Sequence, residues 1–229
     1  MSLFAIGDLH LHFQSELKAP GQLTNPVWKS HEERFLNNCR RMIGPEDTLL
    51  LAGDHSWGRN MAECEQDFAY ILALPGRKIL LRGNHDMFWD AKKTAALNER
   101  FAGKLFFLQN NYAAYQDFAL VGTKGFTFEG PFFLDRKRRV VGWDEEEAAR
   151  AEKLVEREAE RLRVSFEAAK RDGYTKFIMF LPQLWSPASR SVSSGPIIRR
   201  QLFRNRSSWF FHTGFVSWPG AFSSDWKCK

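Results

Sequence analysis

The chain has 229 residues, of which 44% are hydrophobic and 26% are charged, and this balance fits one globular domain with a core of its own. Its three cysteines are scattered along the chain without a close pair, which argues against a disulfide framework and against a cysteine zinc site. The net charge of +6 does not indicate a nucleic-acid partner, because residues 181–229 hold seven of the 33 basic residues and one of the 27 acidic ones, which leaves 26 of each sign in residues 1–180.

No stretch of the sequence predicts a targeting or membrane segment. The first six residues carry no basic group before Asp8 interrupts the apolar run, and no apolar stretch approaches the roughly 18 residues that a membrane helix needs. Unpaired cysteines are typical of a reducing compartment. We therefore expect a cytoplasmic protein with no membrane partner.

Apolar runs and helical patterns alternate from the start of the chain. Short apolar runs predict strands at 2–7, 48–52, 78–81, 105–108, 118–122 and 177–181. Helical spacing and its stop signals predict helices at 31–43, 61–74, 91–101 and 144–171. Strands that alternate with helices favour βαβ units and a mostly parallel sheet, so the predicted fold class is α/β.

Polar residues follow each of the first three predicted strands. They are Asp8 and His10 after the first strand, Asp54 after the second, and Asn84, His85 and Asp86 after the third. Open α/β sheets bind ligands beyond the carboxyl ends of their strands, so we expect these side chains to gather at one edge. Carboxylate, amide and imidazole groups without a thiolate suit Mn, Fe or Zn. Asp54, in the middle of the order, is the natural bridge between two ions.

Two ions ~3.5–4 Å apart suit the hydrolysis of a phosphate ester, because they polarise its oxygens and generate hydroxide near neutral pH. His85 is the candidate acid that protonates the leaving oxygen. Asp86 is the candidate group that orients His85 by accepting its other N–H. The predicted substrate is a phosphate ester, and the predicted enzyme class is a hydrolase.

These residues also resemble a known family. The segments Gly7–His10, Gly53-Asp54 and Gly83–Asp86 are similar to the GDxH, GD and GNHD blocks of the calcineurin-like metallophosphoesterase superfamily, within a bacterial subgroup of uncharacterised members. The resemblance covers roughly residues 1–181. It implies a four-layer α/β/β/α sandwich, two divalent metal ions and hydrolysis of phosphate mono- or diesters. It gives the metal ligands as Asp8, His10, Asp54 and Asn84, and the catalytic pair as His85 and Asp86.

Several neighbouring residues allow other interpretations. Asp8, His10 and His12 also form the kind of cluster with which PHP phosphoesterases begin, although the later blocks fit the calcineurin-like pattern better. His12 is therefore expected in a loop near the cleft. His55 is expected to be structural, and Trp57 and Trp89 either wall the pocket or pack in the core.

The late metal-binding blocks of the family are absent. The family has a histidine after a late strand and then a GHxH block, but Pro182-Gln183 follows the strand at 177–181, and His212 is the one later histidine. We therefore expect this chain to bind metal weakly or singly. A non-catalytic remnant, or a binding protein with an incomplete metal site, is the alternative function.

The composition changes at the same point. Residues 182–229 contain ten of the 15 serines, four of the nine prolines and four of the eight tryptophans, and they hold no glutamate. We expect residues 1–181 to form an incomplete metallophosphoesterase domain and residues 182–229 to form an atypical basic tail, degraded or disordered. A reading-frame shift near codon 181 explains both changes. Translating the coding DNA in the other frames tests this hypothesis, since absence of HxPP-like and GHxH-like text there refutes it.

Overall fold

Parallel strand pairing builds the first of two main sheets. The computed structural model describes residues 1–14, 28–125, 132–134, 140–182, 203–205, 208–211 and 216–218. The strand order of this sheet is β12-β1-β2-β3-β4. Its members are β1 (Leu3–Ile6), β2 (Thr48–Ala52), β3 (Arg77–Leu81), β4 (Leu105–Leu108) and β12 (Val216–Trp218). Strands β1 to β4 are mutually parallel, as predicted, and β12 runs antiparallel to β1 at the edge.

The second sheet has the order β10-β11-β9-β6-β5. Its members are β5 (Ala113–Tyr115), β6 (Phe118–Gly122), β9 (Lys176–Phe180), β10 (Phe203–Asn205) and β11 (Ser208–Phe211). Strands β5 and β6 form an antiparallel hairpin, whereas β6 and β9 are parallel. A separate two-stranded sheet pairs β7 (Phe132–Leu134) with β8 (Val140–Trp143). The sequence analysis did not predict β5, β7, β8 or β10 to β12.

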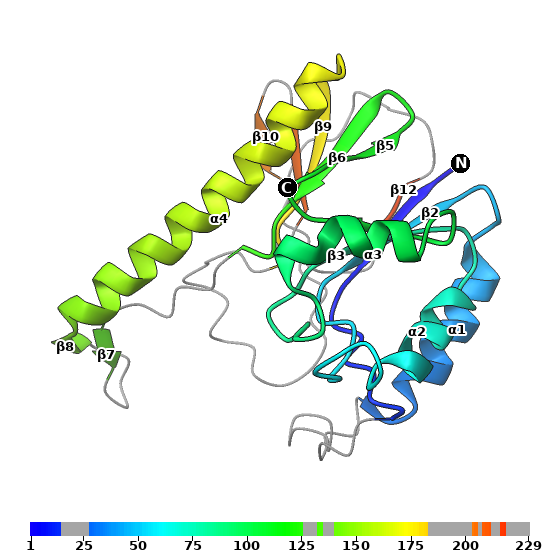
Figure 1. The fold of residues 1–229 in the computed structure, drawn as a ribbon, viewed down its shortest axis with the longest axis horizontal. Helices are drawn as coiled ribbons and strands as arrows, with labels where there is room; N and C mark the ends of the chain where they lie inside the picture. Colours follow the sequence, from blue (N-terminus) through cyan, green and yellow to red (C-terminus); the bar gives the residue numbers. More distant parts are fainter. Residues whose placement is uncertain are drawn as a thin grey trace, which may run out of the picture.

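Helices cover the outer faces of the two sheets. They are α1 (His31–Met42), α2 (Glu65–Leu72), the 3-10 turn η3 (Ala91–Lys93) with α3 (Thr94–Arg100), and α4 (Glu145–Arg171). Helix α2 is shorter than the helix predicted at 61–74, and the helix predicted at 91–101 begins with the 3-10 turn η3. Asp144 caps α4, because its side chain accepts a hydrogen bond from the backbone N–H of Glu147 at 3.0 Å. In Figure 1, α4 lies on the opposite side of the sheets from α1 and α2.

The alternation of side chains along the strands separates the core into layers. Leu49 and Leu51 of β2 pack with the helix side of the first sheet, whereas Leu50 and Ala52 face the second sheet. A third cluster joins Ala119 of β6 and neighbouring strand residues to Ala169 of α4. The molecule is therefore a four-layer α/β/β/α sandwich, which confirms the predicted fold class.

The segment after Pro182 is described only in part. Strands β10 to β12 add to the two sheets, and the other residues of 183–229 lie outside the described residues. The prediction that this tail is degraded or disordered concerns mostly residues outside the described ones. The domain boundary at residue 181 also stays a prediction. Among the described helices, none combines the length and the apolar character that crossing a membrane requires.

Candidate metal centre

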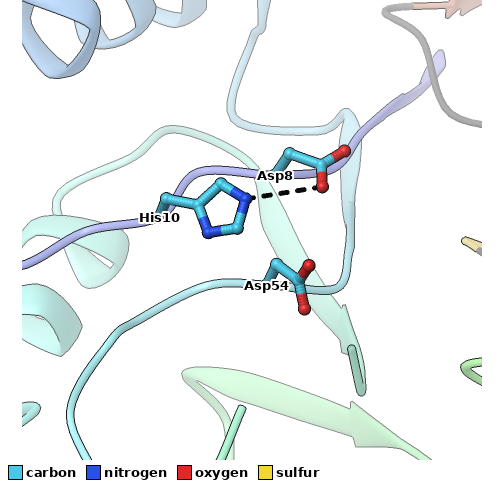
Figure 2. A group of neighbouring side chains, drawn as sticks. All are labelled: Asp8, His10 and Asp54. Atoms are coloured by element: carbon cyan, nitrogen blue, oxygen red, sulfur yellow. Dashed lines mark ion pairs between the residues drawn. The ribbon is translucent and has the colours of Figure 1, made fainter. Parts of the chain in front are cut away.

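Three predicted ligands meet at the carboxyl edge of the first sheet. One ligand atom each from Asp8, His10 and Asp54 lie within 4.8 Å of one another, and the Nε2 atom of His10 is 3.6 Å from the Oδ1 atom of Asp8. Figure 2 shows Asp8 and His10 on one segment and Asp54 on the neighbouring one. The side chain of Asp8 is 49% exposed, whereas His10 and Asp54 are buried. The cluster therefore has one open side.

The backbone holds this cluster by continuing the β1–β2 pairing past the strand ends. The backbone N–H of Asp8 donates to the carbonyl of Gly53 at 3.1 Å, and that of His10 donates to the carbonyl of Asp54 at 2.8 Å. Asp8, His10 and Asp54 all adopt left-handed backbone conformations, with φ values of 60°, 47° and 54°. Such conformations are uncommon outside glycine and concentrate at functional sites.

Two glycines allow the turns after β2 and β3 to pack against each other. A Cβ atom on Gly83 would lie 2.2 Å from both the backbone nitrogen and the Oδ1 atom of Asp54. A Cβ on Gly53, whose φ is +90°, would lie 2.8 Å from the Cα of Gly83. Real side chains do not tolerate such distances. Gly53 and Gly83 are thus both required for the position of Asp54.

The charges at this edge favour a bound cation. Burial raises the pKa of Asp54, and the nearby carboxylates of Asp86 and Asp8 raise it further, while a hydrogen bond from the backbone N–H of His85 and the charge of His10 act in the opposite direction. Two acidic groups and an imidazole thus converge with little neutralising charge of their own. This donor set of carboxylate oxygen and imidazole nitrogen fits a divalent ion such as Mn, Fe or Zn.

An aromatic wall lines the cluster. The ring of Trp57 stacks on His10 with centroids 5.2 Å apart and lies 4.6 Å from the ring of His85. The His85 ring in turn meets His10 edge-on at 5.7 Å, and its backbone N–H donates to the Oδ1 atom of Asp54 at 2.9 Å. Trp28, which the sequence analysis did not single out, meets His10 edge-on at 5.8 Å.

Asp86 does not orient His85, which corrects the predicted role. The side chain of Asp86 is fully buried, and its carboxylate accepts hydrogen bonds from the Nδ1 atom and backbone N–H of His55, at 2.9 and 2.7 Å. It also accepts from the backbone N–H groups of Gly83 and Asp54. The turn after β3 points Asp86 inward, beneath Asp54, and leaves His85 at the surface of the cluster.

The geometry favours the charged form of the buried pair of His55 and Asp86, because the Nδ1 atom of His55 faces the Asp86 carboxylate and its Nε2 atom lies 3.2 Å from the Leu51 carbonyl. Burial alone would lower the pKa of His55, but the charge and hydrogen bond of Asp86 raise it above its ordinary value. Burial alone would raise the pKa of Asp86, but His55 and the backbone donors hold it below its ordinary value. The predicted structural role of His55 is confirmed, and Asp86 shares that role.

The remaining candidates are near the cluster in the chain but differ in their surroundings. Asn84 is half-buried in the turn between Gly83 and His85. His12 lies in the loop after the first block, with its Nδ1 atom 3.2 Å from the carbonyl of His10. Trp89 is a core residue, fully buried, with its Nε1 atom donating to Thr94.

A comparison with protein families agrees with this arrangement. A model of the family described as calcineurin-like phosphoesterase matches residues 1–211, which extends past residue 181. No curated protein matches the chain. A protein of unknown function from Aquifex aeolicus has 18% identity and a TM-score of 0.40, with coverage of 82% of this chain and 81% of that one. A phosphopantetheinyl hydrolase from Mycobacterium tuberculosis has 14% identity and a TM-score of 0.42, with coverage of 78% and 66%. Because both TM-scores are below 0.5, we draw no conclusion from these two structures.

Proposed function

This chain belongs to the calcineurin-like phosphoesterase family, and from that membership we propose that it hydrolyses phosphate mono- or diesters with divalent metal ions held at Asp8, His10 and Asp54. The family is one of phosphoester hydrolases, so the proposal adds the metal ligands and the kind of ester. The observation that carries it is the convergence of these three ligand atoms within 4.8 Å at the end of a parallel sheet.

The ions, when bound, would draw charge from the phosphate oxygens and lower the pKa of the attacking water. The residues of the chain would divide the remaining work. Asp54, whose Oδ1 atom accepts from the backbone N–H of His85, would bind the first ion with Asp8 and His10. It would share the second, weakly held ion of a dinuclear centre with Asn84. His85 would donate a proton to the leaving oxygen, since its ring faces the cluster and is only half-buried.

Trp57 would keep this acid and the metal ligand in place. Its ring contacts both His10 and His85, so it restricts how far either imidazole can rotate. In contrast, Asp86 would act indirectly, because it binds the backbone N–H groups of Gly83 and Asp54. We propose it as a positioning residue in place of the predicted support for His85.

A second candidate function is a non-catalytic binding protein with an incomplete metal site. The observation that favours it is that, in the part of the chain described, the cluster of acidic and histidine ligands has three members. With so few ligands, we propose that metal binding is weak or limited to one ion.

The PHP alternative loses support from the family match and from His12, whose ring contacts the His10 carbonyl. Cys39 and Cys64 are free and buried, which supports a reducing cytoplasmic location.

Hydrolysis of chromogenic esters separates the two functions. We expect the purified chain with added Mn²⁺ to release nitrophenol from a nitrophenyl phosphate monoester, from the corresponding diester, or from both, and to stop when a chelator is added. The ratio of the two rates assigns the kind of ester. Absence of release from either ester at every Mn²⁺ concentration would support the non-catalytic function.

A further inference from the structure

A cluster of basic side chains at the carboxyl ends of β3 and β6 is not used by the proposed chemistry. It consists of Arg82 after β3, Lys124 after β6, and Arg157 and Arg161 on α4. We propose that this basic cluster is an anion subsite that binds a second phosphate group of the substrate, at a distance from the ester that is cleaved. The role in substrate selection rests on the proposed function, whereas anion binding as such does not.

The strand ends bring this cluster to the same edge as the metal ligands. A Cβ on Gly122, the last residue of β6, would lie 3.1 Å from the side chain of Leu81, the last residue of β3. The carboxyl ends of the two sheets therefore touch there. Arg82 follows Leu81 and precedes Gly83, which packs directly against Asp54. Arg82 of the basic cluster is thus adjacent in sequence to the turn that packs against Asp54.

Glu158 ties α4 to this edge and is the acidic group at the centre of the cluster. Its carboxylate is buried, accepts a hydrogen bond from the Thr123 hydroxyl, and forms an ion pair with Arg161 at 2.5 Å. Arg157 is 3.7 Å from the same carboxylate. One carboxylate with these partners neutralises one positive charge, so the four cations retain an excess.

Lys124 is the member of the cluster that argues most directly for an anion subsite. Its side chain is half-buried, and among the described residues its ammonium forms no hydrogen bond or ion pair. Burial lowers the pKa of Lys124, the Glu158 charge raises it, and Arg82, Arg157 and Arg161 lower it by repulsion. Arg82 is also half-buried, and its Nε atom donates to the carbonyl of Trp89 at 2.6 Å. Partly buried cations that repel one another are stabilised by a multivalent anion.

The nearby carboxylates do not supply that anion. Asp86 lies close enough to Arg82 for their charges to interact. Its carboxylate already accepts four hydrogen bonds, one from the His55 ring and three from backbone N–H groups. Asp90, which also acts on Arg82, is exposed, and its carboxylate accepts from the backbone N–H of Lys92. A phosphate offers several acceptor oxygens to a set of such cations, as arginine and lysine clusters commonly require.

Anion binding is tested with inorganic pyrophosphate titrated calorimetrically into the full chain in the presence of a chelator. Without metal, the acidic centre at Asp8 and Asp54 repels the probe, so saturable binding reports the basic cluster. We expect Lys124→Gln to weaken the affinity about tenfold, because a charge-assisted contact is lost. Arg163→Gln is the matched control, since Arg163 lies on α4 but is exposed and paired with Glu160. It should bind as the wild type does.

Absence of saturable binding by the wild type, or equal affinity in Lys124→Gln, overturns the proposal. A second readout uses Mn²⁺ and two substrates, an aryl phosphate monoester and a bisphosphate. Lys124→Gln should raise KM about tenfold for the bisphosphate, with kcat and the KM for the monoester unchanged. An equal rise for both substrates contradicts a role in binding the second phosphate. If the wild type cleaves neither substrate, the proposed function fails, and the pyrophosphate titration decides the anion subsite by itself.

Discussion

Replacing Asp54 with asparagine should reduce ester hydrolysis by more than about 100-fold and should weaken metal binding with it. Losses of 10- to 100-fold are typical for groups that only support a metal ligand, so removal of a ligand charge should exceed them. The substitution preserves the local structure, because asparagine also tolerates the left-handed backbone that Asp54 adopts and retains an oxygen for the N–H of His85. The change therefore isolates the negative charge.

The control for this experiment is Asp117→Asn. Asp117 is an exposed aspartate that pairs with Lys176 on the second sheet, away from the proposed ligands. Rates and Mn²⁺ affinities are measured for both variants with a chromogenic ester. We expect the control to match the wild type. Activity in Asp54→Asn equal to that of the wild type would remove Asp54 from the chemistry.

Replacing Asp86 with alanine should lower the free energy of unfolding by about 3–5 kcal/mol, because it leaves a buried imidazolium without its partner. The carboxylate accepts hydrogen bonds from the Nδ1 atom and the backbone N–H of His55, and from the backbone N–H groups of Gly83 and Asp54. Urea unfolding measures the loss. Asp86→Asn retains one oxygen acceptor and should lose less.

The same pair predicts a dependence of stability on pH. The pKa of Asp86 lies below its ordinary 3.8, so its contribution is present above pH 3.8 and is lost as the pH falls through the lower folded value. The pKa of His55 lies above its ordinary 6.5, so its contribution is present below pH 6.5 and is lost as the pH rises through the raised value. The stability difference between the wild type and Asp86→Ala should be greatest between these two pH values.

Asp117→Ala serves as the control for stability as well, because its ion pair with Lys176 is exposed to solvent. Exposed pairs contribute little, so its effect should be much smaller than that of Asp86→Ala. A similar effect of the two substitutions would mean that the His55–Asp86 pair does not hold the site together.

The parallel sheet and the convergence of Asp8, His10 and Asp54 were predictable because each depends on a local pattern. Apolar runs such as 48–52 end in Gly-Asp, and the parallel order places those ends together. The family match and the convergence of Asp8, His10 and Asp54 agree with that prediction. The short strands β7 and β8 and the edge strands were not predictable, since three or four residues carry too little periodicity.

Partners of individual side chains were harder to predict than their neighbourhood. The sequence places His85 and Asp86 side by side, but adjacent residues in a turn point in different directions, and Asp86 faces His55 from the preceding block. Likewise, Trp28 and Trp57 reach His10 from separate loops. The basic cluster joins β3, β6 and α4, and no spacing along the chain marks that proximity.

The missing late histidines leave the site with fewer ligands than the family resemblance implies. A frame shift near codon 181 remains our explanation, and the coding DNA decides it. The family match extends beyond residue 181 to residue 211, and β11, which lies in this stretch, pairs with β9. Whatever the origin of that stretch, the proposed ligands Asp8, His10 and Asp54 come from the first 54 residues of the chain.

The most direct test of a metal-dependent phosphoesterase is to follow metal occupancy and hydrolysis in one titration. Chelator-treated chain receives increasing Mn²⁺, bound ion is counted by electron paramagnetic resonance, and release of nitrophenol is recorded in the same samples. We predict no release without metal, and a rate that rises in proportion to an occupancy of at most one firmly held ion per chain. Hydrolysis that is equally fast in chelator and in Mn²⁺ would contradict the metal-dependent mechanism, and two tightly held ions would contradict the incomplete site.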